Sequence, residues 1–76
     1  MSEKDDNRLN VIAKKLVVEI KGMVPSMAYM IIKSSHLLFR VNKIDGVPVQ
    51  PEPNDKLMTR INVDVSSGVV SRSWIG

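Results

Sequence analysis

The sequence predicts a small α+β domain, in which one or two N-terminal helices pack on a small mixed or antiparallel β-sheet with a long exposed loop. Three observations predict it: helical periodicity near the N-terminus, a strand–turn–strand pattern at the C-terminus, and a proline-containing polar segment between them. With 76 residues, the chain is expected to form one domain, 1–76. A chain of this size buries only roughly 60% of its unfolded surface, which predicts a small core without a deep enclosed pocket.

The C-terminal segment 59–76 has the most regular pattern. Ile61, Val63 and Val65 alternate with polar residues, so the branched apolar side chains fall on one face of a strand. Gly68 follows two serines and can adopt a positive φ, which is typical of a tight turn. We therefore expect a β-hairpin whose second strand covers 69–75. Trp74 is expected to close the core, with an interface position as the alternative.

Apolar residues in the N-terminal third follow the spacing of one helical face, which predicts a helix over about 7–21. They are Leu9, Ile12, Ala13, Leu16, Val17 and Ile20. A strand over 16–20 is the alternative, because β-branched residues cluster there. Residues 1–6 are charged and polar, and we expect them to form a disordered arm. The amphipathic segment 7–22 is expected to pack on the sheet or on a second subunit.

Pro25 begins a second predicted helix, over about 25–35, because proline is well tolerated in a first helical turn. Met27 and Met30 lie on one stripe of this helix. Together with Met23 they are expected to fill the core, with an adaptable groove for a partner as the alternative. His36 is the one histidine of the chain and is expected at the helix C-terminus rather than in a catalytic or metal site. Over residues 37–43, Leu37, Phe39 and Val41 alternate with Leu38, Arg40 and Asn42, which predicts a strand.

The segment after this strand predicts a turn, a short edge strand and a loop. Asp45 and Gly46 form a strong turn signal, and Pro48 confines 47–49 to a sheet edge. Residues 50–56 contain two prolines and no apolar side chain other than these rings, so they cannot add to a core. A functional loop and a plain linker are both consistent with this composition.

Composition excludes several classes of function. The chain has no cysteine, which removes thiolate metal sites and cysteine nucleophiles and suits a cytoplasmic location. Apolar runs are too short for a membrane span. The net charge of +3 is spread along the chain, which disfavours nucleic-acid binding. Without paired carboxylates or a nucleophile beside a base, we expect no enzyme activity, no catalytic residue, no metal and no cofactor.

Several motifs of the C-terminal two thirds resemble a family of small protease inhibitors. They are Thr59–Val65 (TRINVDV), Ser67–Val70 (SGVV) and the closing Ile75-Gly76. This pattern, with the preceding order of helix, strand and exposed loop, resembles the potato inhibitor I fold and its bacterial elastase-inhibitor-like relatives. The resemblance covers roughly 24–76, and the amphipathic segment 7–22 is additional to it.

This resemblance implies a non-enzymatic binding protein that presents an extended loop, about 47–58, to a serine protease. The scissile bond of the family would lie near 53–55, and Arg60 would support the loop from the strand behind it. The residues implied to form the binding loop are Pro51, Glu52, Pro53, Asn54, Asp55 and Lys56. From the residues alone, Arg60 could instead be an exposed strand residue paired with Asp64 or Glu52.

An alternative function is a small intracellular interaction protein, such as a viral or mobile-element factor, that blocks a host protein or sequesters a nucleotide signal. A nucleotide site would need converging cations, and Arg40, Lys43 and Arg72 are candidates for anion binding. Such a site could form across an oligomer interface. A homodimer would also cover apolar surface that so small a domain leaves exposed.

Overall fold

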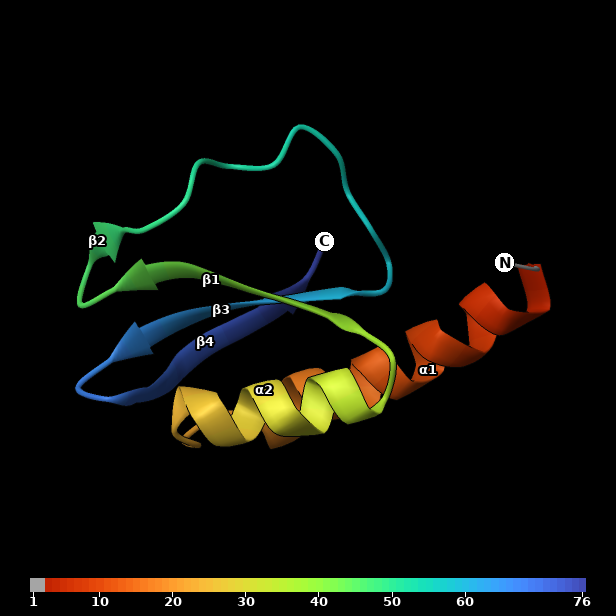
Figure 1. Ribbon diagram of the computed structural model, residues 1–76, viewed down its shortest axis with the longest axis horizontal. Helices are drawn as coiled ribbons and strands as arrows, with labels where there is room; N and C mark the ends of the chain where they lie inside the picture. The colour runs from red at the N-terminus through yellow and green to blue at the C-terminus, as the bar shows by residue number, and fades with distance from the viewer. Residues whose placement is uncertain (1–2) are drawn as a thin grey trace.

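Two helices cover one face of a four-stranded mixed sheet, and a long loop arches over the opposite face (Figure 1). The computed structural model describes the backbone of residues 3–76 and the side chains of residues 7–76. Its elements are α1 (Glu3–Glu19), α2 (Pro25–Ser34), β1 (Leu38–Ile44), β2 (Val47–Pro48), β3 (Arg60–Ser66) and β4 (Val69–Ile75). The predicted α+β architecture is confirmed.

The strand order is β2-β1-β3-β4, with β1 and β3 parallel and the two outer pairs antiparallel. A parallel pair needs a crossover connection, and here β2 and the loop of residues 49–59 supply it. Pro48 lies in β2 at the edge of the sheet, where its missing N–H interrupts no hydrogen-bond ladder. The chain geometry therefore requires the loop to run from the sheet edge back to the central strand.

Both predicted turns form with the geometry that short hairpins favour. Asp45 and Gly46 have φ values of 50° and 81°, and Ser67 and Gly68 have φ values of 52° and 81°. Two successive positive φ angles match the right-handed twist of the strands that they join. The side-chain Oδ1 of Asp45 accepts a hydrogen bond from the Ser67 N–H at 2.9 Å, so the two turns are held together.

The apolar face of β3 forms the centre of the core, as its alternation predicts. Ile61, Val63 and Val65 are buried against the helices. The complete set of buried apolar residues is Ala13, Leu16, Ile20, Ala28, Ile32, Leu37, Ile61, Val63, Val65 and Val70. Ala28 and Ile32 are the buried residues of α2, whereas Met27 and Met30 are 55% and 66% exposed. The expectation that these two methionines fill the core is therefore wrong, because α2 turns its other face to the sheet.

Helix α1 includes residues 7–19 of the predicted helix and ends two residues before the predicted end at 21, so the alternative strand over 16–20 is wrong. Ala13, Leu16 and Ile20 all join the core, and burial of this stripe outweighs the β preference of the neighbouring valines. The helix begins at Glu3 rather than at residue 7, so the backbone of residues 3–6, expected to form a disordered arm, is helical. Residues 1 and 2 of that expected arm lie outside the described part.

The turn between the helices covers part of the outer edge of β4. Gly22 has a φ of 85°, its N–H donates to the Val70 carbonyl oxygen at 2.8 Å, and the Val70 N–H donates to the Met23 oxygen at 2.8 Å. The hydroxyl of Ser73 also donates to the Val17 carbonyl oxygen. Segment 7–22, additional to the family resemblance, is thus joined to the sheet by both its apolar stripe and its backbone.

His36 lies at the C-terminus of α2, as predicted, and its backbone caps the helix. Its φ is 62°; its N–H donates to the Lys33 oxygen at 3.0 Å, and the Leu37 N–H donates to the Ile32 oxygen at 3.2 Å. These two bonds form a Schellman cap, in which glycine is the preferred residue at the left-handed position. A side chain there costs about 1–2 kcal/mol.

We predict that His36→Gly raises the free energy of unfolding by about 1 kcal/mol, because glycine takes the left-handed conformation without strain. Urea denaturation measures the change. The matched control is Lys33→Gly in the last turn of α2, which should lower stability by about the same amount because its conformation is helical. Equal destabilisation by both substitutions would contradict this account of the cap.

Candidate functional site

The face of the sheet opposite the helices is polar, and we call it the polar face. It is formed by Arg40 and Asn42 of β1 and by Arg60, Asn62 and Asp64 of β3. Arg40 and Asn62 are register partners across the parallel pair, and the three β3 residues alternate with the buried apolar ones. Arg40, Asn42 and Asn62 are only 8%, 7% and 2% exposed. Buried polar groups require hydrogen-bond partners.

A chain of hydrogen bonds supplies some of these partners within the sheet. Arg40 Nη1 donates to Asn42 Oδ1 at 3.0 Å, and Asn42 Nδ2 donates to Asp64 Oδ1 at 3.1 Å. The chain ends at Arg72, whose Nη1 lies 3.8 Å from Asp64 Oδ2. The side chain of Arg72 is 75% exposed, so this last ion pair contributes little to stability.

Arg40 holds the first part of the loop. Its Nη2 donates to the Pro51 carbonyl oxygen at 2.8 Å and, at 3.4 Å, to that of Gln50. Just before them, the Val49 N–H donates to the Asn42 carbonyl oxygen at 3.0 Å. Hydrogen bonds from a charged donor contribute about 1.5–3 kcal/mol each. The buried guanidinium and the start of the loop therefore stabilise each other.

Arg60 holds the second part of the loop from the beginning of β3. Its Nη2 donates to the backbone oxygen of Asp55 at 2.9 Å and lies 3.3 Å from Asp55 Oδ1, while its Nε donates to the Gly76 oxygen at 2.6 Å. Its side chain is 12% exposed. Its ion-pair partner is thus Asp55, rather than the Asp64 or Glu52 considered from the sequence alone.

The two arginine contacts leave a central segment, Glu52-Pro53-Asn54, which we call the loop tip. In the described part of the chain, no hydrogen bond involves any of its three residues. Beyond the tip, Asn10 of α1 donates from Nδ2 to the Met58 carbonyl oxygen at 2.9 Å. The loop is therefore attached to the domain on both sides of the tip, and the tip itself makes no such contact.

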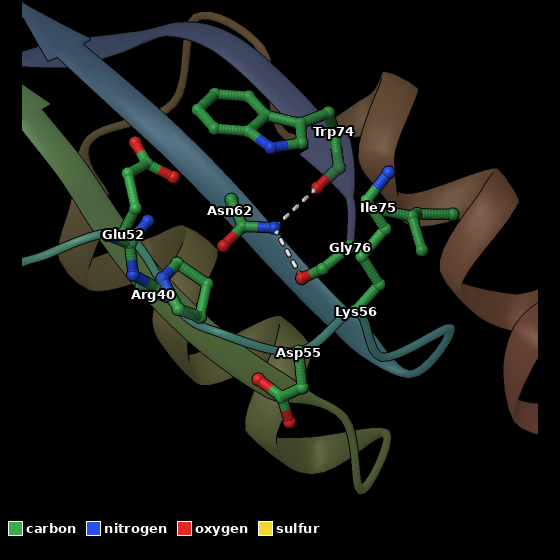
Figure 2. A pocket seen from close by; sticks show the side chains of 9 residues that line it. Arg40, Glu52, Asp55, Lys56, Asn62, Trp74, Ile75 and Gly76 are labelled. Carbon is green, nitrogen blue, oxygen red and sulfur yellow. Dashed lines mark hydrogen bonds between the residues drawn. The ribbon is translucent and has the colours of Figure 1, made fainter.

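A cavity of about 290 Å³ lies between the loop and the polar face, and Figure 2 shows the side chains around it. Asn62 lies centrally, with its amide nitrogen directed toward Trp74 and Gly76 and its oxygen directed away from them (Figure 2). The residues that matter for its chemistry are Arg40, Glu52, Lys56, Asn62 and Trp74. The sequence predicted only that a chain of this length has no deep enclosed pocket, and it did not indicate a cavity between the loop and the sheet.

Trp74 lies beside this cavity and not in the core, which corrects the expectation from the sequence. A β-bulge is the reason: Asp64 pairs with Arg72, but Val65 pairs with Val70, so β4 has one extra residue at this point. The bulge reverses the alternation, and Val70 faces the helices while Trp74 does not. The Arg72 guanidinium lies 5.1 Å from the centre of the Trp74 ring, a favourable cation–π contact.

The three residues considered for anion binding have different environments. The Arg40 guanidinium is buried and donates to loop carbonyls, and Arg72 contacts Asp64 and Trp74. Lys43 is exposed on β1 and pairs in register with Asp64. Lys56, also exposed, lines the cavity.

Sequence reasoning missed Asn42, Asn62 and Trp74 as part of this site. The alternation of Arg40 and Asn42 with Phe39 and Val41 was visible in the sequence, but it predicted only a strand and not what covers its polar face. That a loop buries this face depends on the parallel pairing of β1 with β3, which the sequence left open.

Comparison with protein-family models, with curated proteins and with solved structures finds no match to this chain. Among the described residues, no helix is long and apolar enough to cross a membrane. The same residues hold no group of three or more histidine, cysteine or acidic side chains placed to bind a metal ion. The site is therefore interpreted from its own geometry.

We predict that Arg60→Lys loosens the loop more than it destabilises the fold. Lysine keeps the charge but cannot donate to Asp55 and Gly76 at once, so the amide order parameters of Glu52 and of residues 54–56 should fall from about 0.85 toward 0.6. Backbone ¹⁵N relaxation measures this change. Arg72→Lys, at an exposed position of β4, is the matched control and should leave these values unchanged. Equal loop order in all three proteins would contradict the role of Arg60.

Proposed function

We propose that this protein is a non-enzymatic binding protein that presents the loop tip, Glu52-Pro53-Asn54, to the substrate cleft of a serine protease. The observation that carries the proposal is the pair of arginine contacts, from Arg40 and Arg60, on either side of a tip that makes no hydrogen bond among the described residues. A segment held at both ends and free in the middle can enter a cleft without losing its attachment to the domain.

Rigidity is the physical basis of the proposed binding. Ordering one backbone residue costs about 1–2 kcal/mol, so a tip that is already ordered binds more tightly than a flexible peptide of the same sequence. Pro51 and Pro53 fix their own φ angles and restrict the residues before them, which lowers this cost further. The hydrogen bonds to Pro51 and Asp55 hold the backbone on both sides of Pro53.

The resemblance to small protease inhibitors supports the same function. The implied loop, about 47–58, includes β2 and most of the segment that crosses from β2 to β3, and the implied supporting residue, Arg60, donates to the backbone of Asp55 in that segment. Because the tip carries Glu52 and Asn54 and no large apolar or basic side chain, we propose a protease whose specificity pocket accepts a small polar side chain.

We predict that this protein, at micromolar concentration or below, inhibits at least one serine protease. The measurement uses a panel of proteases whose specificity pockets accept polar, apolar or acidic side chains. Slow or absent cleavage near residues 53–55 should accompany the inhibition. Asn54→Ala should change the inhibition constant of the responding protease, and Arg60→Lys should weaken it by about tenfold through loss of loop order. Arg72→Lys should have no effect. If no member of the panel is inhibited at micromolar protein, the proposed function is wrong.

A further inference from the structure

Part of the outer edge of β4 has no partner strand. The Gly76 N–H donates to the Arg60 oxygen at 3.0 Å, so β4 forms its hydrogen-bonded pairs with β3 at alternate residues counted back from Gly76. The residues between them direct their N–H and C=O groups away from β3, as in any antiparallel pair. Those residues are Ser73 and Ile75. Among the described residues, no backbone hydrogen bond joins either of them to a loop or turn.

The rest of the two sheet edges is covered or protected. At the beginning of β4, the N–H and C=O of Val70 bond to the turn between the helices. At the opposite edge, β2 is two residues long and contains Pro48. Short strands, prolines, charges and covering segments keep sheet edges from pairing with other strands. Residues 73–75 have no proline and no charge, and this part of the edge is therefore available to another strand.

The open edge is ordered before any partner binds. The Gly76 oxygen accepts hydrogen bonds from Arg60 Nε at 2.6 Å and from Asn62 Nδ2 at 2.9 Å, which holds the end of β4 against β3. On the helical side, the Ser73 hydroxyl donates to the Val17 oxygen. A strand that is already extended and held loses little conformational freedom when it pairs, which favours association.

We propose that this edge binds the same edge of a second copy of the chain, with the two β4 strands antiparallel and the two-fold axis at Trp74. Ser73 and Ile75 are two residues apart, so this arrangement pairs Ser73 of each copy with Ile75 of the other. The two pairs form four backbone hydrogen bonds. Every N–H and C=O that Ser73 and Ile75 direct outward then has a partner.

The side chains at this axis are also self-complementary. Trp74 faces its own copy in a pair without backbone hydrogen bonds, where side chains approach most closely and aromatic rings stabilise the contact. The cationic side chains stay apart, because the two Arg72 positions lie four residues apart along the paired strands. That is about 14 Å, which exceeds the screening length of about 10 Å. A second copy therefore fits this edge better than an unrelated extended peptide does.

This interface goes beyond the proposed function and uses no residue of the loop tip. Dimerisation is measured without a protease, and inhibition is measured at protein concentrations where the monomer predominates. Failure of either proposal therefore leaves the other unchanged.

The test is the oligomeric state of the full chain, measured by sedimentation velocity. One strand edge is a small contact, so we expect a dimer with a Kd of about 100 μM. Between about 10 μM and 1 mM protein, hydrogen exchange of the Ser73 and Ile75 amides should then slow about fourfold, as the monomer fraction falls. The Val70 amide already donates to the Met23 oxygen and should exchange at one rate throughout.

Two substitutions at the edge should raise the Kd at least about tenfold. Ser73→Pro removes one outward N–H from each copy, at an edge position where proline is tolerated. Ser73→Ala is its matched control: it also loses the hydroxyl bond to Val17 but keeps the N–H, so its Kd should not change. Trp74→Glu places two carboxylates directly opposite each other at the axis, which destabilises the pair.

Two results would overturn the proposal. One is a chain that stays monomeric up to millimolar concentration. The other is a dimer whose Kd neither Ser73→Pro nor Trp74→Glu changes, since the contact would then lie elsewhere. Amide chemical shifts of Ile61 and Val63 in the core verify that each variant is folded. If Ser73→Pro does not fold, Trp74→Glu on the polar face decides the test.

Discussion

Strand β3 has a neighbour on both edges and a covering layer on both faces, and the rest of the structure depends on this position. Its apolar side chains pack on the helices, whereas Arg60, Asn62 and Asp64 point to the opposite side, beneath the loop. Polar groups placed between two layers of protein must find partners, because desolvation without a hydrogen bond is costly. The loop carbonyl groups provide these partners for the arginines, so the loop and the polar face order each other.

This mutual dependence explains why a segment without an apolar core residue is attached so closely to the domain. Arg40 and Arg60 reach the loop from different strands that are adjacent and parallel, and each donates to a backbone carbonyl on one side of the tip. Carbonyl groups are present whatever the loop sequence, so the tip can carry different side chains while its support remains. The outer side of the tip and the cavity beneath it are two surfaces with different chemistry.

The elements that depend on local sequence could be predicted. The helical stripe through Leu16 and Ile20, the Asp45-Gly46 turn and the alternation around Val63 all specify structure within a few residues. The position of Trp74 could not be predicted, because the bulge opposite Asp64 and Val65 reverses the alternation without a signal such as glycine. The role of Arg40 also depends on a contact eleven residues away, which only the completed sheet establishes.

The most direct test of this account is NMR of the arginine side chains in the intact protein. If Arg40 and Arg60 hold the loop, their Nη–H groups should give separate, slowly exchanging signals, with scalar couplings across the hydrogen bonds to the carbonyl carbons of Pro51 and Asp55. Exposed Arg72 should give one averaged signal. Averaged signals from Arg40 and Arg60 as well would show that the loop is not held from the sheet, and would contradict the account.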